Sequence, residues 1–130
     1  MTAFINGRLY SDAGQLQALN GAAGVPAGAF FYEGWAADSA GSPYVEDLGA
    51  GAVPAAAKFP SGTFAGVAFH EDGRMYVTTQ APAATDAFIG GIAVRQDGAM
   101  RVSTTAVNAA DPLIAGCAIA QTGAARMAIT

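Results

Sequence analysis

The chain has 130 residues, a formal net charge of −4, and a composition that is 52% hydrophobic and only 12% charged. It has one lysine and no basic run, so it lacks the positive patch that binding to nucleic acid requires. The longest apolar run, residues 113–120, is far too short to cross a bilayer, and we expect no membrane partner. The single histidine, His70, and the single cysteine, Cys117, exclude a histidine zinc cluster, a CxxC site and an internal disulfide.

The low charge also bears on association. An ordinary soluble domain has roughly 25% charged residues, about twice the fraction found here. Much of the apolar excess is alanine, which leaves two explanations open: a sequence that is simply rich in alanine, or a surface covered by copies of the chain or by another protein. We favour the second explanation and predict a homo-oligomer. The length suits a single domain, residues 1–130.

The N-terminal part, residues 1–28, is predicted to be a hairpin followed by an arm. Residues 4–10 place Asn6-Gly7 between apolar residues, which is a strong hairpin signal with Gly7 in the turn. Residues 12–15 then have the spacing of a helix capping box. One or two helical turns and an irregular arm both remain open after it.

Residues 29–35 are the most aromatic stretch and are predicted to form one strand. Phe30 and Tyr32 would face one way, and Phe31 and Trp35 the other. The strand is therefore either central and covered on both sides, or part of a contact surface. As interface candidates we take four aromatic residues of this strand and of the first hairpin: Phe4, Phe30, Tyr32 and Trp35.

Between this strand and the C-terminal half the signals are weaker. Residues 38–43 have turn chemistry, and residues 44–48 read as a short strand. Residues 49–60 are rich in alanine and bracketed by Pro54 and Pro60, which indicates an extended loop.

The C-terminal half, residues 63–130, consists of three 25-residue repeats. The repeated segments are residues 66–80, 91–105 and 116–130. Three columns are identical among them: Gly66, Gly91 and Gly116; Ala68, Ala93 and Ala118; Gly73, Gly98 and Gly123. The linkers also align, with Phe88 matching Leu113, so each unit is expected to have a further short strand at its entry.

Each repeat is predicted to be a β-hairpin whose register follows from its apolar residues. A three-residue loop that ends in a left-handed glycine (Gly73, Gly98 or Gly123) pairs Phe69 with Met75 and gathers the apolar side chains on one face. The opposite face would meet water or a polar partner. It carries His70, Arg74, Tyr76, Arg95, Arg101 and Arg126.

Residues for catalysis are scarce, and we predict that the chain is not an enzyme. His70 stands beside a turn, where a histidine is most often a surface residue. Glu46-Asp47 and Glu71-Asp72 point to opposite faces if they are extended, which does not suit paired acid and base chemistry. The glycine-rich pieces do not join a strand to a helix as a phosphate loop does. We expect no cofactor and no metal site.

For the fold we expect an all-β domain, an antiparallel sandwich or jelly-roll-like barrel built from consecutive β-hairpins. The alternative is an intertwined trimer whose 25-residue units stack as β-layers around a shared axis.

The repeated sequence pattern also resembles that of a protein family. A short strand opened by glycine, Asp-Gly, and a strand of methionine, valine and threonine is similar to small virion structural proteins of tailed bacteriophages. Those chains begin with a Phe-Ile-Asn-Gly hairpin and end in tandem Asp-Gly-Arg units. The match covers residues 4–10 and 63–130, and the third copy departs from it with Thr122 in place of aspartate.

The resemblance implies a capsid decoration (cement) protein that stabilises the head by binding across capsomers. Its partner would be the major capsid protein or another virion protein, and it would carry no catalytic residue. The N-terminus lacks the pattern of a signal peptide, which fits synthesis in the host cytoplasm and a place in the virion. Two alternatives stay open. A virion fibre or host-receptor-binding module would use the hairpin loops and Arg95, Arg101 and Arg126, and a carbohydrate-binding module would stack Trp35 and Tyr76 on sugar rings.

Overall fold

The computed structural model describes residues 3–5, 8–10, 14–21, 23–32, 35–59, 67–89, 92–114 and 117–130. Every regular element in them is a strand, which confirms the all-β prediction. The strands are β1 (Ala3–Ile5), β2 (Arg8–Tyr10), β3 (Leu16–Asn20), β4 (Phe30–Tyr32), β5 (Trp35–Ala37), β6 (Tyr44–Asp47), β7 (Met75–Thr78), β8 (Ala87–Ile89), β9 (Ile92–Val94), β10 (Met100–Ser103), β11 (Leu113–Ile114), β12 (Cys117–Ala118) and β13 (Ala125–Ile129).

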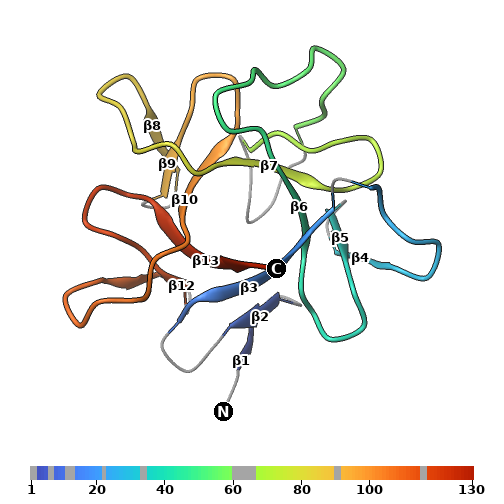
Figure 1. The fold of residues 1–130 in the computed structure, drawn as a ribbon, viewed down its shortest axis with the longest axis horizontal. Coiled ribbons are helices and arrows are strands. Elements are labelled where there is room, and N and C mark those ends of the chain that lie inside the picture. The colour runs from blue at the N-terminus through green and yellow to red at the C-terminus, as the bar shows by residue number, and fades with distance from the viewer. Residues whose placement is uncertain are drawn as a thin grey trace.

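Five of these strands form a closed parallel barrel. β3 pairs with β6, β6 with β7, β7 with β10, β10 with β13, and β13 returns to β3, always in parallel. Figure 1 shows the ring in the middle, with the short hairpins projecting around it. The predicted antiparallel sandwich or jelly-roll is therefore wrong. All five strands come from one chain, so no intertwined trimer is needed to close the sheet.

The predicted hairpin tips are present, but they do not extend into hairpin sheets. Single antiparallel bridges join Phe69 to Met75 and Ile119 to Ala125, and Val94 pairs with Met100, which confirms the three-residue-loop register. Beyond each bridge the second strand leaves its partner and pairs with the equivalent strands of neighbouring units. A parallel arrangement results because every unit sends its last strand through the ring in the same direction.

The chain has five copies of the unit, not three. One glycine in each copy has a positive φ between 95° and 100°, and each precedes a barrel strand: Gly14, Gly41, Gly73, Gly98 and Gly123. We number the units first to fifth after these glycines. Residues 16–20 are thus a barrel strand, and the predicted arm or helical turns after residue 15 are wrong. Gly7 and the column of Gly66, Gly91 and Gly116 lie outside the described residues.

Each unit opens with an outer pair of strand segments. β1–β2, β4–β5, β8–β9 and β11–β12 are antiparallel pairs, so the entry strands expected at residues 87–89 and 113–114 are confirmed. In the third unit the entry segment is reduced to a bridge between Lys58 and Phe69. The single strand predicted over residues 29–35 is wrong, because the chain reverses between β4 and β5.

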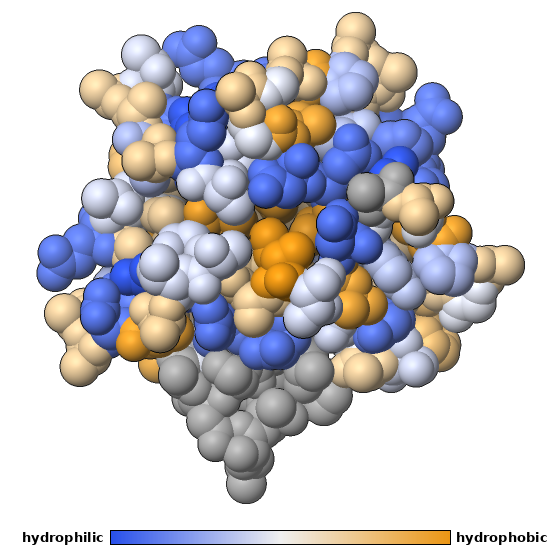
Figure 2. All heavy atoms as spheres, viewed as in Figure 1, coloured by the Kyte–Doolittle hydropathy of each residue, from blue (hydrophilic) through white to orange (hydrophobic). Residues whose placement is uncertain are grey.

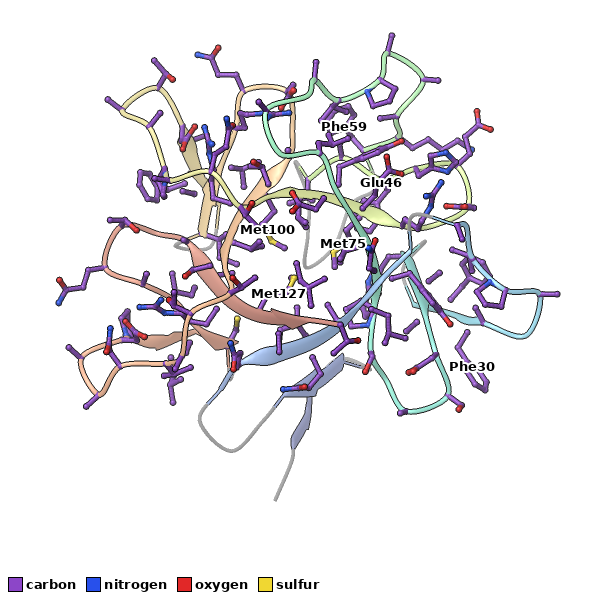
Figure 3. The ribbon with its side chains drawn as sticks, in the orientation of Figure 1. Phe30, Glu46, Phe59, Met75, Met100 and Met127 are labelled. Atoms are coloured by element: carbon purple, nitrogen blue, oxygen red, sulfur yellow. The ribbon has the colours of Figure 1, made fainter. Side chains whose placement is uncertain are left out.

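The core lies inside the barrel and just outside it. Alternate residues of the barrel strands point inward, as a period of two requires, and Met75, Met100 and Met127 meet near the middle in Figure 3. The second layer, between the barrel and the outer segments, includes Trp35 and Phe69. In Figure 2 hydrophobic residues gather near the centre of the face, over the barrel, and hydrophilic residues surround them.

Candidate interaction surface

A repeated hydrogen bond joins the second, third, fourth and fifth units each to the next one in the ring. In each case the N–H of an alanine donates to the carbonyl of the positive-φ glycine of the following unit. The pairs are Ala36 to Gly73 (2.9 Å), Ala68 to Gly98 (2.8 Å), Ala93 to Gly123 (2.8 Å) and Ala118 to Gly14 (2.8 Å). The last of these closes the ring from the fifth unit back to the first.

The identical alanine and glycine columns of the sequence follow from this contact. A Cβ on Gly98 would lie 3.0 Å from Cβ of Ala68, and a Cβ on Gly123 would lie 3.0 Å from Cβ of Ala93. Both side chains must therefore be minimal for the backbones to approach. The positive φ adds a second reason for glycine, since side-chain-bearing residues rarely adopt that conformation.

Opposite each of these alanines, on the outer segment, stands a large apolar residue. Phe31 pairs with Ala36, Phe88 with Ala93 and Leu113 with Ala118. Phe59 follows the bridged Lys58 and holds the same position in the third unit. We call Phe31, Phe59, Phe88 and Leu113 the apolar column. Phe4, in β1 opposite Leu9, has the matching register in the first unit.

Each column residue packs against the neighbouring unit on one side and is exposed to solvent on the other. Cε1 of Phe59 lies 2.6 Å from the place where a Cβ on Gly98 would be, and Cε1 of Phe88 lies equally close to that of Gly123. The edge of each phenyl ring thus covers the turn glycine of the next unit. The exposed fractions are nearly equal: 61% for Phe31, 58% for Phe59, 63% for Phe88 and 62% for Leu113.

The predicted interface residues are placed differently from one another. Phe30 is 51% exposed and lies at the periphery in Figure 3. Trp35 is only 2% exposed, so it belongs to the core and the expectation of a contact role for it is wrong. Phe4 and Tyr32 belong to described strands, but their side chains lie outside the described residues. Phe31, Phe59, Phe88 and Leu113 were missed as surface residues, although the alignment of Phe88 with Leu113 was already a signal.

The arginines of the fourth and fifth units are bound internally. Arg101 holds Asp86 through two hydrogen bonds of 2.9 Å, and both side chains are buried. Arg126 holds Asp111 in the same way, at 2.9 and 3.3 Å. In both pairs the aspartate lies 15 residues before the arginine and ties the linker to the barrel strand. The hydrogen bond from each guanidinium lowers the pKa of its aspartate.

Arg74 and Arg95 are also engaged with groups of the same chain. Arg95 binds Asp97 at 2.7 Å and the carbonyl of Gly51 at 2.6 Å, and the hydrogen bond from Arg95 lowers the pKa of Asp97 to about 2. Arg74 binds Asp72 and Glu46. We expected this face to meet water or a polar partner, and these arginines meet polar partners of the same chain, carboxylates and carbonyls, instead of open water.

Groups with catalytic potential are few in the part of the chain that the structure describes. Nδ1 of His70 lies 2.9 Å from Oδ1 of Asp72, at a half-exposed turn. The described residues contain no group of three or more His, Cys, Asp or Glu side chains that could hold a metal ion. A hollow of about 340 Å³ between the fourth and fifth units is lined by threonines and serine, with Arg126 as its charged residue. That guanidinium is already engaged with Asp111.

Comparisons with known proteins give no relative. No protein-family model matches the chain, and no curated protein or solved structure matches it. Within the described residues no helix is long and apolar enough to span a membrane. The apolar column is therefore the surface feature of the described residues that bears most directly on function.

Proposed function

We propose that this chain is a structural protein of a bacteriophage virion, a capsid decoration (cement) protein that binds the major capsid protein across capsomers. The observation that carries the proposal is the apolar column. It sets large apolar side chains, each more than half exposed, around a body in which four arginines are each paired with a carboxylate of the same chain, namely Arg74, Arg95, Arg101 and Arg126. Such a surface favours contact with protein over contact with an ionic ligand.

The architecture suits a cementing role. Five units share one core and close on each other by hydrogen bonds, so the body can present its outer surface without rearranging. Rigid partners lose little conformational entropy on binding, and more of the buried area then appears as affinity. The resemblance of the 25-residue repeats, one of which carries Asp72-Gly73-Arg74, to the units of small virion proteins points in the same direction.

The two alternatives have less support. The fibre or receptor-binding alternative would use the hairpin loops together with Arg95, Arg101 and Arg126, and each of these arginines is bound to an aspartate of its own chain. The carbohydrate-binding proposal needed Trp35 and Tyr76 at the surface. Both are 2% exposed, so neither can stack on a sugar ring.

The test is binding to shells. Purified protein is mixed with empty shells assembled from the major capsid protein of the phage that carries this chain, and the mixture is sedimented. We expect saturable co-sedimentation and shells that resist higher temperature, whereas shells of an unrelated phage leave the protein in the supernatant. Failure to bind the cognate shells would refute the proposal. Loss of host adsorption on deletion of the chain, with heads intact, would favour the fibre alternative.

A further inference from the structure

We propose that the apolar column docks on a partner with five-fold rotational symmetry, namely the pentameric vertex of the shell. This inference rests on the proposed decoration role and revises its contact: on the five-fold axis the chain joins the five subunits of one vertex capsomer. Its basis is the internal symmetry of the chain, which sets one large apolar residue per unit around the barrel axis.

The units are close to rotational copies of one another. At each step around the barrel the register shifts by two residues, as in Val77 opposite Met100, Val102 opposite Ala125 and Met127 opposite Leu16. The joining hydrogen bonds differ by only 0.1 Å, and the turn glycines differ by only 5° in φ. Rotation about the barrel axis therefore carries each column residue onto the next, at the same height and radius. The nearly equal exposures of 58–63% agree with this equivalence.

Area decides how many column residues a partner must contact. A fully exposed phenylalanine offers about 200 Å², so one column residue exposes only about 120 Å², and the four together expose about 500 Å². A stable interface buries about 800 Å² on each partner. A partner that reaches one unit alone has too little apolar contact, whereas a partner that engages the whole column reaches the required range once the polar surroundings are added.

Simultaneous engagement needs matching sockets. A pentamer repeats one socket five times around one axis, so each column residue can meet the same surface. A six-fold capsomer cannot match five positions spaced around a circle. Engaging several weak contacts at once multiplies their effect, which gives firm attachment from individually small patches.

The chain offers a matched control for this docking. Phe30 is adjacent to Phe31 in β4, is of the same residue type and is 51% exposed, but its register position is occupied by Ala87 in β8 and by Ala3 in β1. It is therefore outside the column. Phe30→Ser should leave docking unchanged, whereas Phe31→Ser and Phe88→Ser should each weaken it about tenfold, and the double variant about a hundredfold.

The experiment is cryo-electron microscopy and quantitative sedimentation of the cognate shells saturated with the full chain. We expect about a dozen copies per shell, located at the vertices, since an icosahedral shell has one pentamer at each of its five-fold axes. Melting of each variant checks that it is folded before its binding is compared.

The other outcomes separate the two proposals. Copies spread over hexameric capsomers, or docking that Phe31→Ser and Phe88→Ser leave unchanged, would overturn the vertex inference while the decoration role stands. No binding to the shells at all would overturn both. A doubled mass in light scattering that Phe88→Ser abolishes would assign the column to a second copy of the chain and would also overturn the vertex inference.

Discussion

The first two units and the last two units reach the same geometry with different side chains. At the outward position of the barrel strand the fourth and fifth units carry Arg101 and Arg126, each held by a buried aspartate. The first two units carry Gln17 and Tyr44 there. All four have their turn glycine at a φ near 95–100°. The geometry thus depends on the glycine turn and the apolar interior, and the ion pairs are an addition to it.

The comparison also separates what a unit needs from what it tolerates. Inward positions are apolar in every unit, as with Leu16 in the first and Met127 in the fifth, and both are buried. Outward positions vary because each faces a different linker, and Arg126 also reaches Ser103 of the preceding unit. We therefore expect substitutions at the turn glycines to be costly throughout the ring, and substitutions at outward positions to be costly where an ion pair has to be broken, as at Arg101, or where the side chain is buried, as at Tyr76.

The largest effect is expected from Gly98→Ala, which should lower the free energy of unfolding by about 3 kcal/mol. The unfavourable φ of +100° accounts for roughly 1–2 kcal/mol, and the contact with Phe59 and Ala68 adds the rest. Urea denaturation of the variant and the parent chain measures this change in the free energy of unfolding. Gly28→Ala is the control, because a Cβ there meets nothing within 4 Å.

The same change in an early unit sharpens the comparison. Gly41 has a φ of 95°, so Gly41→Ala should cost about 1–2 kcal/mol even though its sequence surroundings differ from those of Gly98. If Gly41→Ala melts like Gly28→Ala, the second unit is not a true copy of the later ones.

The next effect is expected from Asp86→Asn, which leaves Arg101 buried without its counter-charge. We expect a loss of about 2 kcal/mol in the free energy of unfolding, since removing one partner of a buried pair is destabilising. Gln17→Ala, at the position in β3 that matches Arg101, should cost less than about 1 kcal/mol. Equal losses would contradict the difference drawn between early and late units.

A double replacement distinguishes the ion pair from the packing around it. Asp86→Leu combined with Arg101→Leu removes both charges, so it should recover part of the stability that Asp86→Asn loses. A double variant that is less stable than Asp86→Asn would show that the linker depends on the hydrogen-bond geometry and not on charge balance.

Acid should weaken the late units in a defined pH range. The pKa of Asp97 is about 2 in the folded chain, below the value of about 3.9 expected when unfolded. The stability that it contributes is therefore complete above about pH 4 and is lost as the pH falls toward about 2. The pKa values of Asp86 and Asp111 are lowered as well and act in the same direction. The melting temperature should fall over this range, and less steeply in Asp97→Asn; identical profiles would contradict the assignment.

The smallest effect on stability is expected in the apolar column. Phe88→Ser and Phe31→Ser should each change the free energy of unfolding by less than about 1 kcal/mol, because both side chains are more than half exposed. Thermal melting of the two variants measures this in a late unit and in an early one. A loss comparable to that of Gly98→Ala would show that the column serves the fold more than a partner.

Sequence reasoning found the late units because they keep the 25-residue spacing and three identical columns. It missed the first two because the turn glycines Gly14, Gly41 and Gly73 are spaced by 27 and 32 residues instead of 25. In addition, residues 12–15 around Gly14 have the spacing of a helix capping box, which predicts a helix and not a strand. It also began the third unit at residue 63, whereas its entry segment is bridged at Lys58. A search for any glycine followed by alternating apolar residues, as at Leu16 and Ala18, would have found the earlier copies.

Local chemistry determined the turns and the inward faces of this protein: glycine sets the left-handed corner, and a period of two sets which side chains avoid water, so Phe69 opposite Met75 could be read from the chain alone. The pairing of the last strands with one another was decided only by the tertiary structure. Parallel neighbours come from segments about 25 residues apart, and β13 returns to β3 across almost the whole chain. No local pattern records such a pairing, because its free energy comes from closing the ring and not from any one unit.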